Sequence, residues 1–262
     1  MPRIQLATLG FAMLALLLFA KVAEAERPFI VDSADSLLLR KAQLETYVIA
    51  NDEFVDHSLF FNMGLTDWLE FSFGARHGIQ FAAVQETYRL NAPLLELKGS
   101  VMRPRGWRPG LALVSGVRPP WGVGEARPRG FGGYVYASVT ERMYFDIFAL
   151  HLNLGINMQG EGKGVPADRA LVDWLTGGVA LDVRAHERVA VIAEFAYRDP
   201  YDPRANRRMN VQGGIRIFIN DWTELDFGLG GGFDRDIPAL ELRSGRAIFG
   251  TAGFRFRDTY RW

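Results

Sequence analysis

Alternating apolar and polar residues over positions 211–233 constrain this chain more than any other feature of its sequence. A period of two around a short polar turn is typical of a β-hairpin with one apolar face and one polar face. Both faces stay consistent if the turn spans residues 221–223, which predicts that Ile217 pairs with Phe227. Such a hairpin fits half of a soluble sandwich, or a wall with lipid outside and water inside.

The same period recurs along most of the chain. Residues 58–76 and 171–197 form two further predicted hairpins with three-residue turns, pairing Phe61 with Phe71 and Val183 with Val189. About twelve strands are predicted in all, and alternation that fails to close near Asp146 indicates a β-bulge there.

The predicted connections alternate between long polar segments and short turns. Outer-membrane barrels have this asymmetry because their short turns lie on the periplasmic side and their long loops outside. A soluble sandwich gives no reason for it, since both of its ends meet the same solvent. We therefore expect an all-β fold: a single transmembrane, antiparallel, up-and-down β-barrel of about twelve strands, of the outer-membrane type, over residues 42–262.

The first residues are expected to be removed. Arg3, an apolar run over residues 9–20 and the small residues Ala23 and Ala25 match a secretory signal peptide over residues 1–25, which predicts export to the bacterial outer membrane. The polar lead-in 26–41 is predicted to lie in the periplasm. It either enters the barrel mouth as a plug, with residues 37–39 meeting lumenal groups such as Phe60, or remains a frayed terminus.

Large aromatic residues gather at the predicted short turns and at the end of the chain. A girdle at the membrane interface is the expected role of this set, which comprises Trp68, Trp107, Tyr144, Trp222 and Trp262. The final strand has alternating apolar and polar residues, and the chain ends on an aromatic residue. This pattern resembles the C-terminal signal that the outer-membrane insertion machinery recognises in barrels. That machinery is a predicted partner.

Four stretches, 27–35, 64–70, 117–122 and 150–155, together resemble the outer-membrane transporter family linked to the meta-pathway of phenol degradation. The resemblance covers most of the chain after residue 26. It implies a small barrel and the passage of small compounds, aromatic or hydrophobic ones included. Arg40 and Lys41 depart from the family pattern, which has a glycine ahead of the first strand.

A ring of about twelve strands encloses a narrow lumen, wider than that of an eight-stranded barrel. Side chains of both charge signs fall at predicted inward positions: Glu45, Glu70, Arg76, Glu96, Lys98, Arg118, His151, Asp182, Arg184, Glu194, Arg216, Glu224, Asp226, Arg255 and Arg257. They would line a pore for a small-molecule solute without strong charge preference. Alternatively, they pair with one another and only brace a non-conducting interior.

Other classes of function find little support in the sequence. Equal numbers of basic and acidic residues, 30 each, argue against a nucleic-acid partner. The histidines His57, His77, His151 and His186 lack metal-ligand spacing, so neither a metal nor a cofactor is expected. The nearest approach to a catalytic pair is His151 with Ser138 on the neighbouring strand, which lacks a third group, and no enzyme is expected.

The predicted outer loops are rich in arginine. Guanidinium groups suit phosphate, so these loops could hold lipopolysaccharide, or their charges are simply solvated. The residues concerned are Arg127, Arg129, Arg204, Arg207, Arg208, Arg235 and Arg243. Outer-membrane lipid and lipopolysaccharide are the expected surroundings of the barrel.

Overall fold

The computed structural model describes residues 29–51, 54–81, 87–105, 107–124, 130–144, 146–160, 171–198, 201, 209–233 and 248–259. The expected signal peptide, Trp262 and the seven outer-loop arginines lie outside the described residues. No helix in the described part of the chain is long and apolar enough to cross a membrane.

The described residues form thirteen antiparallel strands. Their bounds are β1 (Lys41–Ala50), β2 (Phe54–Gly64), β3 (Leu69–Gln80), β4 (Thr87–Met102), β5 (Gly110–Arg118), β6 (Gly122–Val123), β7 (Gly132–Met143), β8 (Phe148–Gly160), β9 (Leu171–His186), β10 (Val189–Tyr197), β11 (Met209–Phe218), β12 (Thr223–Phe233) and β13 (Ile248–Thr259).

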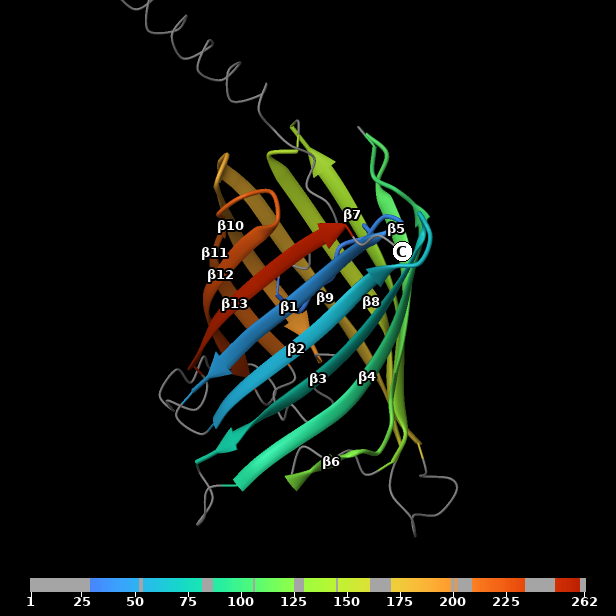
Figure 1. The fold of residues 1–262 in the computed structure, drawn as a ribbon, viewed down its shortest axis with the longest axis vertical. Coiled ribbons are helices and arrows are strands. Elements are labelled where there is room, and N and C mark those ends of the chain that lie inside the picture. Colours follow the sequence, from blue (N-terminus) through green and yellow to red (C-terminus); the bar gives the residue numbers. More distant parts are fainter. Residues whose placement is uncertain are drawn as a thin grey trace, which may run out of the picture.

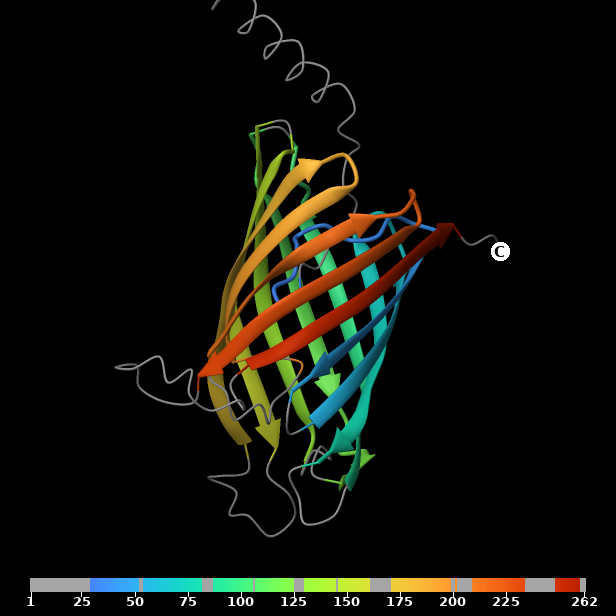
Figure 2. The ribbon, with the colours of Figure 1, turned by 90° about the vertical axis from the view of Figure 1, so that its left-hand side faces the viewer.

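Twelve of these strands close into one ring, as predicted. Neighbours in sequence pair with each other, β13 returns to pair with β1, and the two-residue β6 adds to the end of β4. Figures 1 and 2 show the tilted strands closing into one barrel, with the short turns gathered at one end. A ring leaves no open edge, which satisfies backbone hydrogen bonding in a lipid environment.

The wall has two distinct faces because side chains alternate along each strand. In β5, for example, Ala112, Val114 and Arg118 are buried inside the barrel, whereas Leu113 and Val117 are half exposed on its outer surface. Exposed leucine, valine, isoleucine and phenylalanine side chains recur on the outer face of nearly every strand. An apolar outer band of this kind is the surface that a transmembrane barrel presents to lipid.

All three predicted hairpin registers are wrong by two residues. The observed pairs are Ile215 with Phe227, Phe61 with Phe73, and Val183 with Val191. A slip of two residues keeps every side chain on its own face, so the alternation that predicted the faces does not fix the turn length. The turns after β2 and β11 hold more residues than the predicted three. The β9–β10 hairpin instead contains a bulge next to Val189.

The predicted bulge near Asp146 is also wrong. Strands β7 and β8 pair without interruption up to Met143 and Phe148. Between them lies a turn in which Tyr144 and Asp146 both have positive φ, 51° and 64°. Alternation fails there because the chain leaves the sheet. Bulges occur instead at Ala75, at Val101 and next to Val189.

Arg40 has a φ of 65°, in the left-handed region that favours glycine. It immediately precedes β1, where the resembled family has a glycine. A glycine, which the resemblance predicts at this point, would adopt this conformation with less strain than arginine does.

Candidate functional site: the lumen and the N-terminal segment

Residues 29–38, here called the N-terminal segment, lie inside the barrel at its short-turn end (Figure 2). The peptide N–H groups of Ile30 and Val31 donate to the Glu194 carboxylate at 2.9 and 2.8 Å. The N–H of Leu37 donates to Glu70 at 2.7 Å. Two carboxylates on the inner wall therefore hold the backbone of this segment.

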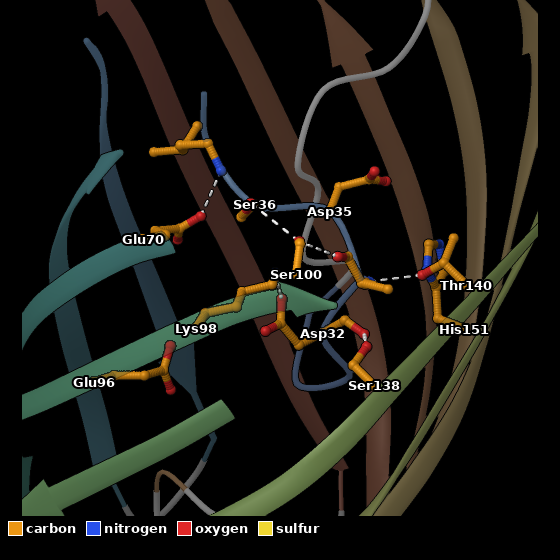
Figure 3. A network of polar contacts seen from close by, with 12 residues as sticks. Asp32, Asp35, Ser36, Glu70, Glu96, Lys98, Ser100, Ser138, Thr140 and His151 are labelled. Carbon is orange, nitrogen blue, oxygen red and sulfur yellow. Dashed lines mark hydrogen bonds and ion pairs between the residues drawn. The ribbon is translucent and has the colours of Figure 1, made fainter. Parts of the chain in front are cut away.

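Asp32 is the centre of the polar contacts between the segment and the wall (Figure 3). Lys98 Nζ lies 3.0 Å from its carboxylate, and both side chains are almost fully buried. The Tyr136 hydroxyl donates to the same carboxylate at 3.2 Å, and Ser138 Oγ donates to the Asp32 carbonyl at 2.7 Å. A buried ion pair with supporting hydrogen bonds fixes this part of the segment against β4 and β7.

Further contacts with β4 and β7 continue the attachment along the segment. Ser100 Oγ donates to the Ala34 carbonyl at 2.8 Å, and the Ala34 N–H donates to Thr140 Oγ1 at 2.8 Å. Asp35 forms an ion pair of 2.7 Å with Arg142. Leu37 is buried, but Leu39 is 48% exposed, so the segment is held mainly by polar contacts and less by its leucines.

Glycines in the wall make room for the segment. A Cβ added to Gly178 would lie 2.6 Å from Val31 Cγ2, and one on Gly214 would lie 2.9 Å from the Phe29 ring. Contacts this short do not occur between real side chains, so the segment packs where the wall has no Cβ.

An aromatic cluster lies beside the segment in the lumen. It comprises Phe60, Tyr134, Tyr136 and Tyr201, with Tyr47 packed against Phe60. Glu96 accepts hydrogen bonds from the hydroxyls of Tyr134, at 2.5 Å, and Tyr201, at 3.1 Å. The rings of Tyr134 and Tyr136 stack at 5.8 Å between centroids.

Three arginines and several carboxylates form a second cluster on β1 and β9 to β13. Arg216, whose side chain is fully buried, contacts Asp226 through Nε at 2.7 Å and through Nη2 at 3.0 Å. Arg255 and Arg257 contact Glu224 at 2.7 and 2.9 Å. Bidentate arginine–carboxylate pairs of this kind are strong and hold their geometry.

The structure places the predicted lumen residues as follows. Buried in the interior are Glu45, Glu70, Glu96, Lys98, Arg118, His151, Asp182, Glu194, Arg216, Glu224 and Arg255. Half-buried at inward positions are Arg76, Arg184, Asp226 and Arg257. Arg184 lies near the short-turn end, with its guanidinium 3.9 Å above the Phe218 ring.

The predicted inward set omits three charged residues of the inner wall: Asp56, Arg89 and Arg142. Asp56 forms ion pairs with Arg76 at 3.0 Å and with Arg89 at 2.5 Å. Asp56 and Arg89 lie outside the predicted hairpin of residues 58–76, whereas in the structure β2 begins at Phe54 and β4 at Thr87. Asp56 alternates with Val55 and His57 in the pattern of the rest of β2, and this alternation predicts that the strand extends to these residues.

The pairing of His151 with Ser138 is wrong. His151 Nδ1 lies 3.0 Å from Thr140 Oγ1, on the residue directly opposite. Ser138 faces Asn153 across the strands, and its hydroxyl binds the Asp32 carbonyl. Within the part of the chain that the structure describes, no group of three or more acidic or histidine side chains could hold a metal ion.

The aromatic residues assigned to the girdle that the structure describes are exposed. Trp68, Trp107, Tyr144 and Trp222 lie at the short-turn end, and each is more than half accessible. Trp121 and Phe131 are exposed between β5 and β7, near the opposite rim.

No protein-family model and no curated protein sequence matches this chain. The fold is similar to that of the COG4313 outer membrane channel from Pseudomonas putida F1, with TM-score 0.58 and 10% identity over 90% of this chain and 100% of that chain. It is also similar to the NanC porin, with TM-score 0.51 and 6% identity over 84% of this chain and 100% of that chain. At such identities the likeness concerns the fold: a closed barrel resembling bacterial outer-membrane proteins.

Proposed function

We propose that this protein is an outer-membrane channel for the passive passage of small compounds, aromatic or hydrophobic ones included, and that the N-terminal segment closes it. The observation that carries the proposal is the attachment of that segment. It lies in one end of the lumen, and reversible contacts hold it there: Glu194 and Glu70 accept from its backbone N–H groups, and Lys98 pairs with the Asp32 carboxylate.

The chemistry of the lumen supports the class of solute. The rings of Tyr134, Tyr136 and Phe60 are buried against one another in the lumen, and withdrawal of the N-terminal segment would expose faces on which an aromatic solute stacks; Glu96 fixes two of the tyrosine hydroxyls of the cluster. Charges of both signs alternate with these rings, so strong selection for anions or cations is not expected. The resemblance to the family linked to phenol degradation points to the same solutes.

The surroundings of the barrel follow from its outer face. We place the apolar band in outer-membrane lipid and lipopolysaccharide, with Trp68, Trp107, Tyr144 and Trp222 at the interface. Residues 1–25 serve as the export signal, and the alternating β13 is the element that the insertion machinery engages. Residues 29–38 act as the plug.

Single-channel recording in planar bilayers tests the proposal. The mature chain should show a low or flickering conductance, and a variant lacking residues 26–38 should show larger and longer openings. Proteoliposomes should take up phenol faster than vesicles without protein, and the deletion should increase that rate. A closed lumen in both proteins at all voltages would rule out a channel.

The second candidate is a non-conducting barrel that is structural, or that binds lipopolysaccharide or a partner protein through its loops. One contact favours it: Tyr136 binds both Asp32 of the N-terminal segment and Tyr201, which follows β10. The lumen is thus bridged from both ends at the same residue. If the deletion variant is folded yet conducts no current, this second function replaces the first.

A further inference from the structure

Three side chains on neighbouring strands form a connected chain on the outer wall of the barrel. Thr46 of β1 has its hydroxyl 2.5 Å from His57 Nε2, on β2. His57 Nδ1 lies 2.9 Å from His77 Nε2, on β3. The strand register explains these contacts, since His57 is directly opposite His77 and diagonal to Thr46.

These side chains point away from the lumen. Their neighbours along each strand, Glu45, Asp56 and Ser58, are buried inside, and alternation turns Thr46, His57 and His77 outward. The same outer face carries exposed apolar side chains on the same strands, Leu44, Leu59, Phe73 and Ile79. All three members of the chain are half-buried and so accessible from outside the barrel.

A polar cluster in this position needs a reason. Polar side chains that face hydrocarbon lose hydrogen bonds to water, and ionisable residues at membrane depth are rare and generally functional. His57 and His77 are each three residues from the end of their strand that lies away from the β2–β3 turn, which is Phe54 in β2 and Gln80 in β3. The cluster therefore lies in the half of the wall opposite the short turns.

The atoms in contact define roles for the three side chains. If His57 Nδ1–H donates to His77 Nε2, then Nε2 of His57 keeps a lone pair that accepts the Thr46 O–H. In this arrangement a hydroxyl donates to Nε2 of a histidine, and a third group holds Nδ1 of the same ring. Hydrolases use this geometry for a nucleophile, a general base and a residue that orients the base. That third group can be neutral, as the asparagine of cysteine proteases is.

We propose that Thr46, His57 and His77 form a second site, on the outer wall, that hydrolyses esters of long-chain fatty acids. Thr46 is the nucleophile, His57 is the base, and His77 is a positioning residue that holds the tautomer of His57. The site is separate from the lumen, so it does not depend on the proposed channel function.

The reaction balances with water as the only co-reactant. Thr46 Oγ attacks the ester carbonyl carbon while His57 Nε2 takes its proton, and the leaving alcohol receives that proton as the C–O bond breaks. Water then attacks the acyl-threonine, again giving a proton to His57, which returns it to Thr46 Oγ. The products are the alcohol and the free fatty acid.

The position of the site selects the substrate. Lipid acyl chains would surround this face of the barrel. Leu59, directly opposite Thr46, and the exposed Phe73 and Ile79 on β3 give them an apolar surface. The shared chemistry is a fatty acyl carboxylic ester. Glycerophospholipids and the acylated glucosamines of lipopolysaccharide are its two sources in this membrane.

The test uses the full mature chain in detergent micelles with p-nitrophenyl decanoate as the probe. The native protein should release p-nitrophenolate, and Thr46→Val and His57→Phe should each slow release about 100-fold or more. His186→Gln is the matched control, because His186 is exposed at the end of β9, and it should leave the rate unchanged. Folding of each variant is verified by its altered gel mobility before and after heating.

A second readout separates catalysis from a structural role. His77→Ala should lower kcat, whereas His77→Asn, which retains an acceptor for His57 Nδ1–H, should recover most of it. A fluorophosphonate should form a covalent adduct with Thr46, detected by mass spectrometry, and should form none with the folded Thr46→Val variant. If the folded native protein hydrolyses nothing, or if Thr46→Val leaves hydrolysis intact, the proposal is overturned.

The source of the ester is settled by two further arms. Fatty acid release is measured from phosphatidylethanolamine vesicles and, separately, from purified lipid A in mixed micelles. Release from either supports the site and identifies its substrate. If the protein cleaves the p-nitrophenyl ester but releases fatty acid from neither lipid, the assignment of a lipid substrate is overturned.

Discussion

Tyr136 and Tyr201 share a hydrogen bond of 2.6 Å between their hydroxyl oxygens inside the barrel. Tyr136 belongs to the wall strand β7, whereas Tyr201 follows β10 at the end of the barrel opposite the short turns. Since Tyr136 also binds Asp32, at 3.2 Å, the N-terminal segment and the region after β10 meet through one side chain. Under the proposed function, closure of the lumen would therefore depend on both of these parts of the chain.

Removing the Tyr201 hydroxyl should weaken this bridge. The Tyr201→Phe variant keeps the ring but loses the hydrogen bonds to Tyr136 and Glu96. Each such bond contributes roughly 1 kcal/mol, so we expect a several-fold longer open time in planar bilayers. Tyr88→Phe, at an exposed position on the outer face of β4, serves as the control and should leave gating unchanged. Equal open times for Tyr201→Phe and the native protein would contradict the bridge.

The ion pair between Asp32 and Lys98 should hold the N-terminal segment in place. The Asp32→Ala variant leaves the Lys98 ammonium buried without its closest acid, which costs about 3–5 kcal/mol. The segment should leave the lumen so that water reaches Lys98, and conductance should rise while the barrel stays folded. Thr66→Ala, in the exposed turn between β2 and β3, should cause no such increase. Proteolysis of the released segment offers an independent measurement.

Gly178 should be essential for seating the segment. A Cβ at this position would lie 2.6 Å from Val31 Cγ2 and 2.9 Å from the Phe195 carbonyl oxygen of β10. The β10 backbone is held in the sheet, so Gly178→Ala should displace Val31 and raise conductance. Gly213→Ala is the matched control, because the nearest atom there, the Ile192 carbonyl oxygen, lies 3.6 Å away. If both variants conduct alike, the close packing at Gly178 has no role in closure.

Arg216 should be a main source of stability. Its fully buried guanidinium neutralises Asp226 and also approaches Glu224 and Asp182. The Arg216→Met variant leaves these acids without that charge and should lower the free energy of unfolding by about 3–5 kcal/mol. Urea unfolding in detergent, followed by tryptophan fluorescence, measures the change.

Two further variants interpret that result. Arg216→Lys should recover only part of the loss, because an ammonium group does not reproduce the bidentate contact with Asp226. Arg188→Met, at a pair whose side chains are mostly exposed, should shift stability by less than about 1 kcal/mol. A small effect of Arg216→Met would show that water, and not this arginine, satisfies the acids.

The wall could be predicted from the sequence because its signal is local. Alternation along β11 and β12 assigns Arg216 and Asp226 to one face and Phe227 to the other without knowledge of any partner strand. The register could not be predicted in this way. A slip of two residues conserves every face, and the choice between slips depends on turn geometry and cross-strand packing.

The ends of the strands are harder to predict from the sequence than their middles, for a related reason. Polar residues at inward positions resemble a loop where few apolar residues alternate with them, as around Asp56 and Arg89. Only their contact with each other, across β2 and β4, shows that both belong to the wall.

The sequence alone determined a closed antiparallel barrel of about twelve strands, because a period of two and alternating connection lengths are properties of the chain itself. Tertiary structure decided what fills the lumen and what stands on the outer wall. Asp32 meets Lys98 only when the N-terminal segment enters the closed barrel, and His57 meets His77 only in the register that the β2–β3 hairpin adopts. Such contacts depend on register and closure, which no single segment encodes.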